Sequence, residues 1–278
     1  MVMRSRSPAL QWPPAGPVWW CDQSCCANDR FAATVESYPL AVSRTSGGNR
    51  RGHEQWTMTV TAVTDLHPRL RRVTFGADEF ATFAAEGPDE CFGWLLPTGD
   101  RPHLRWYTVR HHRPDRAEID VDVVLHGDEG PASRFAARAQ VGAIAGFRSS
   151  GAAYSPPGDG ASQLLLGDET SMPALGAIVE SLPSGTSGVR AVVEVPDSSW
   201  TYRIGGDVAV EWRPRDERPP GSCLLDVVSE RPASVGYAWV CGEAGAVRAI
   251  RRQLIEGWGL DRRRITFSGY WRQGGPRA

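Results

Sequence analysis

Lysine is absent from this 278-residue sequence, and all 31 of its basic residues are arginine. This absence excludes mechanisms that need a lysine amine, such as a Schiff base, a P-loop lysine or a lysine general base. The net charge is −1, which argues against the strongly basic surface that is typical of nucleic-acid-binding proteins. No apolar run approaches the roughly 18 residues that a transmembrane helix needs.

Cysteine is too sparse and too scattered for a disulfide framework. Cys21, Cys25 and Cys26 crowd near the N-terminus, and the other cysteines are far apart. No CxxC pair occurs, and the motifs HExxH, GxSxG and GxxxxGK[ST] are also missing. We therefore expect no metal site and a reducing, cytoplasmic location.

The first 55 residues are rich in Pro, Gly, Ser and Arg and show no hydrophobic periodicity. Arg4 and Arg6 precede an apolar stretch, but its prolines and Gly16 disfavour the helix of a signal peptide. We expect residues 1–55 to form a mostly disordered extension.

The next hundred residues predict a β-domain. Several short stretches alternate apolar and polar residues or are rich in β-branched ones, and only one short helix is expected. The expected strands are 57–63, 70–75, 105–110 and 119–125, with a turn over 111–117 and a helix over 131–138. Many short strands with little helix indicate an antiparallel barrel or sandwich.

The pattern changes after residues 149–160, whose composition is that of a linker. Continuous apolar runs now alternate with apolar residues at helical spacing, which predicts a parallel sheet with crossover helices. The expected strands are 163–166, 190–195 and 238–241, and the expected helices are 172–182 and 247–254. We expect two domains, over residues 56–157 and 158–278.

One strand carries residues that suit a flat, charged ligand. Residues 105–110 combine an aromatic ring and a hydroxyl with two guanidinium groups, which fits a planar molecule that also bears phosphate. On this stretch alone, a cross-strand pair with surface arginines is the favoured interpretation.

Three loops join a strand to a helix start, where backbone N–H groups and strand ends commonly bind ligands. They are residues 126–133, 167–173 and 240–245. For the first loop an ordinary capped turn is the favoured interpretation, because a single glycine-rich turn is weak evidence for a ligand site. Helix capping explains the second loop, and tight packing the third, about as well as ligand binding does. The aromatic residues in 269–272 fit either a cofactor cover or a seal for the core.

Taken in sequence order, these motifs resemble one known family. They are Arg105-x-Tyr107-Thr108-Val109-Arg110, Leu125-His126-Gly127, Gly130-Pro131-Ala132-Ser133, Gly167-Asp168-Glu169-Thr170, Trp239-x-x-Gly242-Glu243 and Gly269-Tyr270-Trp271-Arg272. They resemble the siderophore-interacting proteins, which are flavin-dependent ferric-siderophore reductases of the ferredoxin-reductase-like superfamily. The resemblance runs from about Trp56 to Gly274. It implies an N-terminal antiparallel Greek-key β-barrel that binds FAD, followed by a doubly wound parallel-sheet domain that binds NAD(P)H.

The resemblance also implies roles for individual residues. Tyr107 and Thr108 would be catalytic, with Tyr107 stacked on the isoalloxazine and Thr108 hydrogen-bonded near its reactive nitrogen. Contacts to FAD would come from Arg105, Tyr107, Thr108, Val109, Arg110, Val124, His126, Gly130, Pro131, Ala132 and Ser133. The reduced nicotinamide would meet Asp168, Glu169, Thr170, Gly242, Glu243 and Trp271. Arg248 and Arg272 would bind the anionic ferric siderophore, where the family often has lysines.

The expected function is the transfer of electrons from NAD(P)H, or from a ferredoxin, through FAD to Fe(III) in a siderophore. Reduction lowers the charge of iron and weakens its hold on hard oxygen ligands, so iron is released as Fe(II). Asp197 is placed to meet a ribose hydroxyl, which favours NADH, whereas Arg203 is placed to meet a 2′-phosphate, which favours NADPH. The two residues therefore point to different donors, and the resemblance favours NADPH.

Two rival functions remain open, and the chain is expected to be a monomer. The same fold suits a flavin enzyme with another acceptor, such as a quinone. It also suits a siderophore-binding protein without catalysis.

Overall fold

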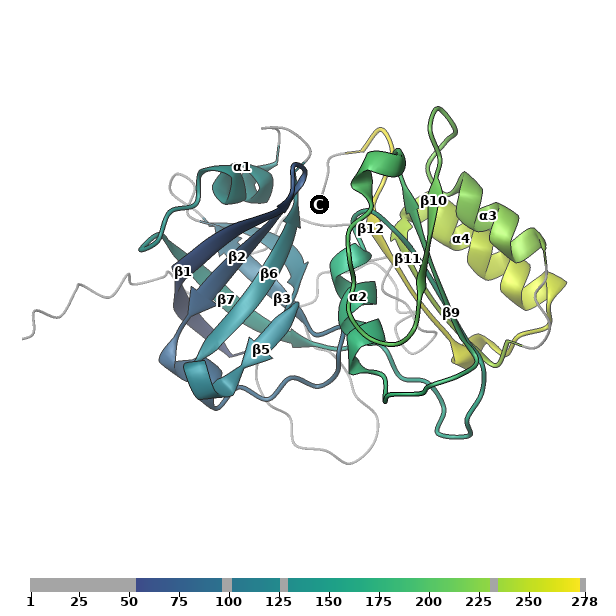
Figure 1. Cartoon of the computed structure of the whole chain (residues 1–278), viewed down its shortest axis with the longest axis horizontal. Helices are drawn as coiled ribbons and strands as arrows, with labels where there is room; N and C mark the ends of the chain where they lie inside the picture. Colours follow the sequence, from purple (N-terminus) through teal and green to yellow (C-terminus); the bar gives the residue numbers. More distant parts are fainter. Residues whose placement is uncertain (1–53, 97–101, 126–129, 231–234, 276–278) are drawn as a thin grey trace, which may run out of the picture.

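The computed structural model of the protein describes residues 54–96, 102–125, 130–230 and 235–275. Within these ranges the chain forms a β-domain and an α/β-domain that lie side by side, as Figure 1 shows. None of the helices among the described residues is long and apolar enough to cross a membrane.

The first domain is an antiparallel sheet that curls into a barrel (Figure 1). Its strands are β1 (Gln55–His67), β2 (Leu70–Gly76), β3 (Cys91–Leu96), β4 (His103–Thr108), β5 (His111–Arg113), β6 (Glu118–Val124) and β7 (Ile144–Gly151), in the spatial order β4-β3-β7-β1-β2-β6-β5. Alternate residues such as Val73 and Phe75 point into the core and are fully buried. Helix α1 (Pro131–Arg138) lies over one end of the barrel.

Three local expectations for this domain were wrong. The strand predicted over residues 105–110 ends at Thr108. The predicted turn over 111–117 contains strand β5, which pairs with β6, and a short 3₁₀ helix, Pro114–Arg116. Strand β7 continues to Gly151, inside the predicted linker. The last two differences depend on a partner strand, because β5 and the end of β7 are polar stretches that become extended by pairing with β6 and β3.

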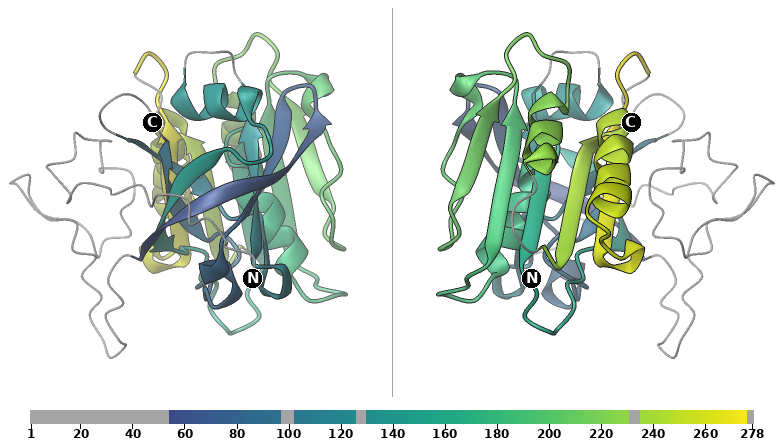
Figure 2. Two further views of the ribbon diagram at one scale, coloured as in Figure 1. Left: turned by 90° about the vertical axis from the view of Figure 1, so that its left-hand side faces the viewer. Right: turned by 90° about the vertical axis from the view of Figure 1, so that its right-hand side faces the viewer.

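The second domain is a parallel sheet with helices on both faces, which confirms the expected doubly wound fold. Its strands are β8 (Gln163–Asp168), β9 (Val189–Val195), β10 (Val210–Pro214), β11 (Tyr237–Glu243) and β12 (Ile265–Trp271), in the order β10-β9-β8-β11-β12. Helix α2 (Met172–Ser181) packs on one face, and α3 (Ser222–Ser229) and α4 (Ala244–Arg252) pack on the other. The right-hand view of Figure 2 shows α4 in front of the sheet.

The two domains share apolar contacts. Leu70 and Val124 of the barrel belong to the same hydrophobic cluster as residues of α2 and of the parallel sheet. Figure 1 shows α2 on the side of that sheet that faces the barrel. A buried hydrogen bond adds to this contact, because the indole N–H of Trp239 donates to Asp89 of the barrel at 3.1 Å. The domains are therefore packed against each other over a common core.

Candidate functional site

Strand β4 presents an aromatic ring, a hydroxyl and a guanidinium group within four residues. The ring of Tyr107 contacts that of Trp94 edge to face, with 5.1 Å between the ring centroids. Burial raises the pKa of the Tyr107 phenol, which therefore stays protonated at neutral pH. Thr108 is buried and lies opposite Cys91 of β3. This arrangement offers a flat apolar surface beside a hydroxyl, which suits an isoalloxazine ring.

Arg105 lies two residues before Tyr107, on the same face of β4. One of its guanidinium nitrogens, Nη1, donates to the carbonyl oxygen of Leu104 at 2.8 Å. A guanidinium has five N–H donors, so Arg105 keeps donors for a diphosphate group.

The start of helix α1 offers a second binding group for a diphosphate. Gly130 is the N-cap residue, its backbone is extended, and it has no side chain with which to cap the helix. Pro131 occupies the first turn, and Ala132 and Ser133 are buried behind it. An uncapped helix start favours an anion through its backbone N–H groups and the helix dipole. The donor set of Arg105 and this turn therefore fits the diphosphate of FAD. His126, predicted to contact FAD, lies outside the described residues.

Arg110, which was predicted to bind FAD, forms ion pairs within the protein, and its contact with FAD stays a prediction. Its Nη1 and Nη2 atoms each donate to a carboxylate oxygen of Glu180 at 2.6 Å, and its Nε lies 3.6 Å from Asp122. The side chain of Arg110 is only 2% exposed. Both terminal nitrogens are thus occupied by helix α2, and the guanidinium joins the two domains.

Two apolar residues that were predicted to contact FAD lie in the protein core. Val109 is buried in the barrel core, and its N–H donates to the carbonyl oxygen of Glu90 at 2.8 Å. Val124 belongs to the cluster between the domains. Their contact with FAD stays a prediction.

Asp168 gathers several predicted residues at the carboxyl ends of the parallel strands. Its Oδ1 accepts hydrogen bonds from the backbone N–H of Thr170 at 2.9 Å and from the Thr170 hydroxyl at 2.6 Å. Its Oδ2 accepts from the backbone N–H of Glu243 and from the indole N–H of Trp271, each at 2.8 Å. The ends of β8, β11 and β12 thus meet on one carboxyl group.

Gly242 is required by this arrangement. Its φ is +148°, and a Cβ atom there would lie 2.5 Å from Oδ2 of Asp168. Burial and the neighbouring Glu169 raise the pKa of Asp168 to about 7, although its hydrogen-bond donors oppose the shift. A carboxyl group with a raised pKa therefore lies at the place where a nicotinamide ring is expected.

The other two predicted carboxylates also bind within the protein. Glu169 forms a two-point ion pair with Arg215, with both N–O distances 2.8 Å. Glu243 caps α4, because its Oε2 accepts from the N–H of Ala246 at 2.8 Å, and its Oε1 accepts from the N–H of Gln273 at 3.2 Å. Carboxylates, rather than the backbone amides of a glycine-rich loop, therefore make the contacts at the carboxyl ends of the parallel strands. The first residues of helix α2 are buried.

Arg248 and Arg272, predicted to bind the siderophore, are both exposed. Arg248 lies on α4 and Arg272 directly follows β12, and these two elements pack against each other. Across the described ranges, no three His, Cys, Asp or Glu side chains form a cluster that could hold a metal ion.

The sequence analysis missed the residues that join the domains. Asp89 accepts from Trp239, which is 150 residues away, and Arg110 pairs with Glu180, which is 70 residues away. No local pattern marks such partners. Tyr270 was considered only as a terminal aromatic, yet it is partly buried against the apolar cluster that the two domains share. Its pKa is raised well above the usual value, first by burial and then by the thiols of Cys241 and Cys91.

Family models match most of the described chain. The model described as "Siderophore-interacting protein" matches residues 160–274, and that described as "Siderophore-interacting FAD-binding domain" matches residues 90–153.

Individual proteins with known sequences or structures are also similar. An uncharacterised protein of Mycobacterium tuberculosis is 33% identical over 258 residues, which span 77% of this chain and 89% of that protein. The ferric vibriobactin reductase ViuB of Vibrio cholerae is 30% identical over 182 residues, covering 63% of this chain and 66% of ViuB. The crystal structure of a siderophore utilization protein from T. fusca superposes with a TM-score of 0.72 at 28% identity, covering 81% of this chain and 95% of that one.

Proposed function

Because this chain belongs to the siderophore-interacting protein family, we propose that it is an FAD-dependent reductase of ferric siderophores. In this proposal it passes electrons from NADPH to Fe(III) in a siderophore, and the iron leaves as Fe(II). The name of the relative ViuB, a ferric vibriobactin reductase, supports this reaction. The proposed domains are residues 56–157 for FAD and 158–278 for the nicotinamide, and the proposed active form is a monomer.

One observation carries the proposal. The proposed flavin-binding face of β4 ends at Thr108, opposite Cys91, and two residues before Cys91 the carboxylate of Asp89 accepts the indole N–H of Trp239 in β11 at 3.1 Å. At the carboxyl ends of the parallel strands, Trp271 of the neighbouring strand β12 hydrogen-bonds to Asp168. The proposed flavin and nicotinamide sites are therefore adjacent, which direct hydride transfer requires.

The chain's own residues have separate tasks in this function. Arg105 and the first turn of α1 hold the diphosphate, and Tyr107 packs against the isoalloxazine ring. Thr108 donates a hydrogen bond near the reactive nitrogen. FAD suits the task because it accepts two electrons as a hydride and can release them singly. Arg248 and Arg272 attract the anionic ferric siderophore.

NADPH is the proposed donor. Arg203 is exposed and available for a 2′-phosphate, whereas Asp197 already accepts from the N–H of Ser199 at 2.9 Å. A ferredoxin is the alternative donor. Stopped-flow reduction with NADPH, NADH and reduced ferredoxin ranks the three, and reduction that is faster with NADH than with NADPH contradicts the choice.

The test of the function starts with the absorption spectrum of the purified protein. Flavin bands are expected, and their absence after reconstitution with FAD would favour a binding protein without catalysis. The protein is then photoreduced and mixed with ferric vibriobactin or with a quinone. Rapid reoxidation by the ferric siderophore alone is expected. Faster reoxidation by the quinone would instead favour a flavin enzyme with another acceptor.

A further inference from the structure

Asp89 lies where the barrel, the segment between the domains and the parallel sheet meet. Its carboxylate accepts hydrogen bonds from the backbone N–H groups of Ala153 at 3.0 Å and of Tyr154 at 2.9 Å, and from the indole N–H of Trp239 at 3.1 Å. Ala153 and Tyr154 follow β7, and Trp239 is in β11. Asp89 and Trp239 are both buried, which strengthens the hydrogen bond between them. One carboxylate therefore holds both the connecting segment and the α/β-domain.

The charge of Asp89 suits it to this task. Hydrogen bonds to an ionised acceptor are shorter than those between neutral groups and roughly twice as strong. A carboxylate accepts on both of its oxygens: Oδ1 of Asp89 accepts from Ala153 and Tyr154, and Oδ2 accepts from Trp239. The amide of an asparagine has an N–H donor in place of one oxygen, so it can satisfy the connecting segment or the indole but not both.

The connecting segment is also held from the α/β-domain. The hydroxyl of Thr266 donates to the carbonyl oxygen of Ala153 at 3.2 Å, and the hydroxyl of Tyr237 donates to Thr266 Oγ1 at 2.8 Å. The same Tyr237 oxygen accepts from the N–H of Ser155 at 3.1 Å. Residues 153–155 are therefore bonded to Asp89 on one side and to β11 and β12 on the other. A segment held from both sides fixes the orientation of the domains and does not act as a free hinge.

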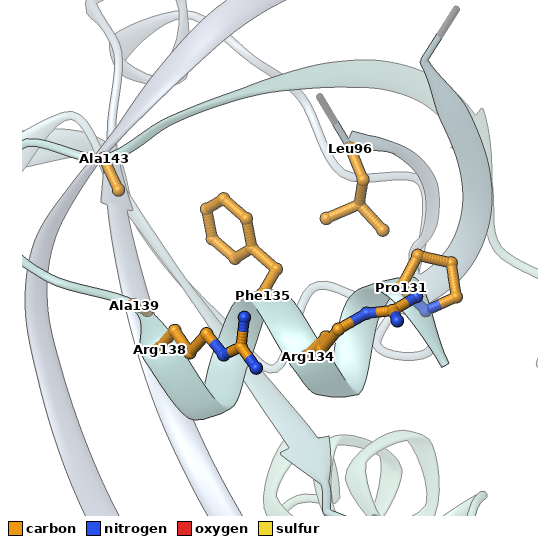
Figure 3. A pocket seen from close by; sticks show the side chains of 7 residues that line it. All are labelled: Leu96, Pro131, Arg134, Phe135, Arg138, Ala139 and Ala143. Carbon is orange, nitrogen blue, oxygen red and sulfur yellow. The ribbon is translucent and has the colours of Figure 1, made fainter. Parts of the chain in front are cut away.

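Strand β3 connects Asp89 to the proposed flavin site. Cys91, two residues after Asp89, is the first residue of β3 and is paired with Thr108 of β4. At the other end of β3, Leu96 lines the same pocket as Pro131 in the first turn of α1, as Figure 3 shows. The strand thus runs from Asp89, past the partner of Thr108, to the helix turn that we propose for the diphosphate of FAD. A displacement of Asp89 against the α/β-domain would therefore displace the whole proposed flavin site.

Strand β11 connects Trp239 to the proposed nicotinamide site in the same way. Glu243, at the end of β11, donates its backbone N–H to Asp168 at 2.8 Å. All residues of β11 are buried, and the strand pairs with β8 on one side and with β12 on the other. Such a strand cannot shift without the rest of the close-packed sheet. The hydrogen bond between Asp89 and Trp239 therefore joins two rigid strands, and each strand leads to one of the two proposed sites.

We propose that Asp89 is a positioning residue for hydride transfer, because its hydrogen bond to Trp239 sets the separation of the flavin and nicotinamide sites. This inference rests on the proposed function and deepens it. Hydride transfer needs the two reacting atoms about 3–3.5 Å apart, and a misplacement of about 1 Å can cost roughly 100-fold in rate. The ion pair of Arg110 and Glu180 also joins the domains, but it does so through helix α2 and not through β11.

The test compares Asp89→Asn and Trp239→Phe, which remove the same hydrogen bond from its two sides, with Glu180→Gln, which weakens a different contact between the domains. Stopped-flow absorbance follows flavin reduction over a range of NADPH concentrations. We expect the limiting rate to fall about tenfold in the first two variants, with an unchanged half-saturating NADPH concentration, and to keep the parent value in Glu180→Gln. Reduction by dithionite, which does not use the nicotinamide site, should be unchanged in all three.

Two further measurements do not depend on turnover. In the apoprotein, the indole ¹H–¹⁵N signal of Trp239 should move upfield in Asp89→Asn, because a hydrogen bond to a carboxylate is lost. The charge-transfer absorbance of NADPH with oxidised flavin should be weaker in Asp89→Asn and in Trp239→Phe, because it depends on the separation of the rings. The double variant should be reduced no more slowly than either single variant, because both changes remove one bond.

The outcomes separate this inference from the function itself. Parent limiting rates in Asp89→Asn and Trp239→Phe would overturn the positioning role and leave the reductase function intact. Equal slowing in Glu180→Gln would also overturn it, because any weakened contact between the domains would then have the same effect. Trp239→Phe keeps Asp89 and its bonds to the connecting segment, so this variant decides the question if Asp89→Asn does not fold. A parent protein that neither NADPH nor NADH reduces would overturn the positioning role together with the nicotinamide donor.

Discussion

Arg110 of the barrel and Glu180 of helix α2 form a two-point ion pair between the domains, with both N–O distances 2.6 Å. His111 takes part through its Nε2, 3.2 Å from Glu180, while its Nδ1 lies 3.0 Å from Asp120. The pair therefore ties the segment that directly follows β4, the strand with Tyr107 and Thr108, to the α/β-domain. Loss of this ion pair should lower the stability of the fold more than it slows the redox reaction.

We expect Glu180→Gln to reduce the free energy of unfolding by about 3 kcal/mol, because it removes the carboxylate that both terminal nitrogens of a buried guanidinium bind. The double variant Arg110→Met/Glu180→Met should recover most of this loss, because it leaves no buried charge unpaired. Urea unfolding of the three proteins measures the effect. Equal losses in both variants would contradict the role of the ion pair.

The contribution of the Glu180 carboxylate to the stability of the fold should decrease as the pH falls. Its hydrogen bonds and ion pair with Arg110 lower its pKa to about 2, below the usual value of 4.5. A lowered pKa stabilises the folded state above the unfolded pKa, and this contribution disappears as the pH falls towards 2. The stability difference between parent and Glu180→Gln should therefore be largest above pH 5 and shrink below pH 4. A constant difference would contradict the prediction.

Thr108→Ala should slow reduction of the bound flavin about fivefold and leave FAD content unchanged. The expected cost is that of one hydrogen bond, about 1 kcal/mol. Thr108→Ser keeps a hydroxyl and serves as the control. Stopped-flow absorbance at the flavin band measures the rate. Wild-type rates in Thr108→Ala would show that the Thr108 hydroxyl has no role in flavin reduction.

Replacing Arg248 and Arg272 together with alanine should slow reoxidation by an anionic ferric siderophore about tenfold at low salt, because electrostatic steering is lost. The difference should fade as salt screens the charges. FAD content and reoxidation by a neutral acceptor should not change. The exposed Arg262, replaced alone, is the control. Equal second-order rates for parent and double variant at low salt would overturn the assignment.

Asp168 should titrate near pH 7, and Trp271 can report it because its indole N–H donates to the carboxylate. We expect the indole ¹H–¹⁵N signal of Trp271 to shift with a midpoint near 7, and to lose this titration in Asp168→Asn. A raised folded pKa stabilises the fold below the unfolded pKa of 3.8, and the contribution is lost as pH rises through 7. The parent should therefore lose stability relative to Asp168→Asn between about pH 4 and 7 and show little further loss above that. An indole signal that stays flat around pH 7 would show that Asp168 keeps one charge.

The parts of the site that follow from local pattern were predictable from the sequence. Carboxyl ends of parallel strands meet at one edge, so the loops at Asp168 and Gly242 were expected near each other, and one hydrogen bond to Asp168 joins them. Helix α1 was predictable because Gly130 and Pro131 begin an apolar spacing of four.

Features that depend on contacts with other parts of the chain were not predictable from the local sequence. Arg110 belongs to a motif that suggested a phosphate contact, but its partner Glu180 lies 70 residues away on a helix whose position depends on the packing of both domains. Strand β5 has only three residues, and its extended form depends on pairing with β6.

The apolar cluster that contains Leu70, Val124 and helix α2 makes the two halves interdependent. A fragment ending after β7 would leave Leu70 and Val124 in water, and the remaining fragment would expose the buried face of α2, including Leu175 and Ile178. Neither half is then a self-sufficient module that can be exchanged between proteins. Transfer of this fold onto another protein, by evolution or by engineering, therefore requires that both domains are transferred together.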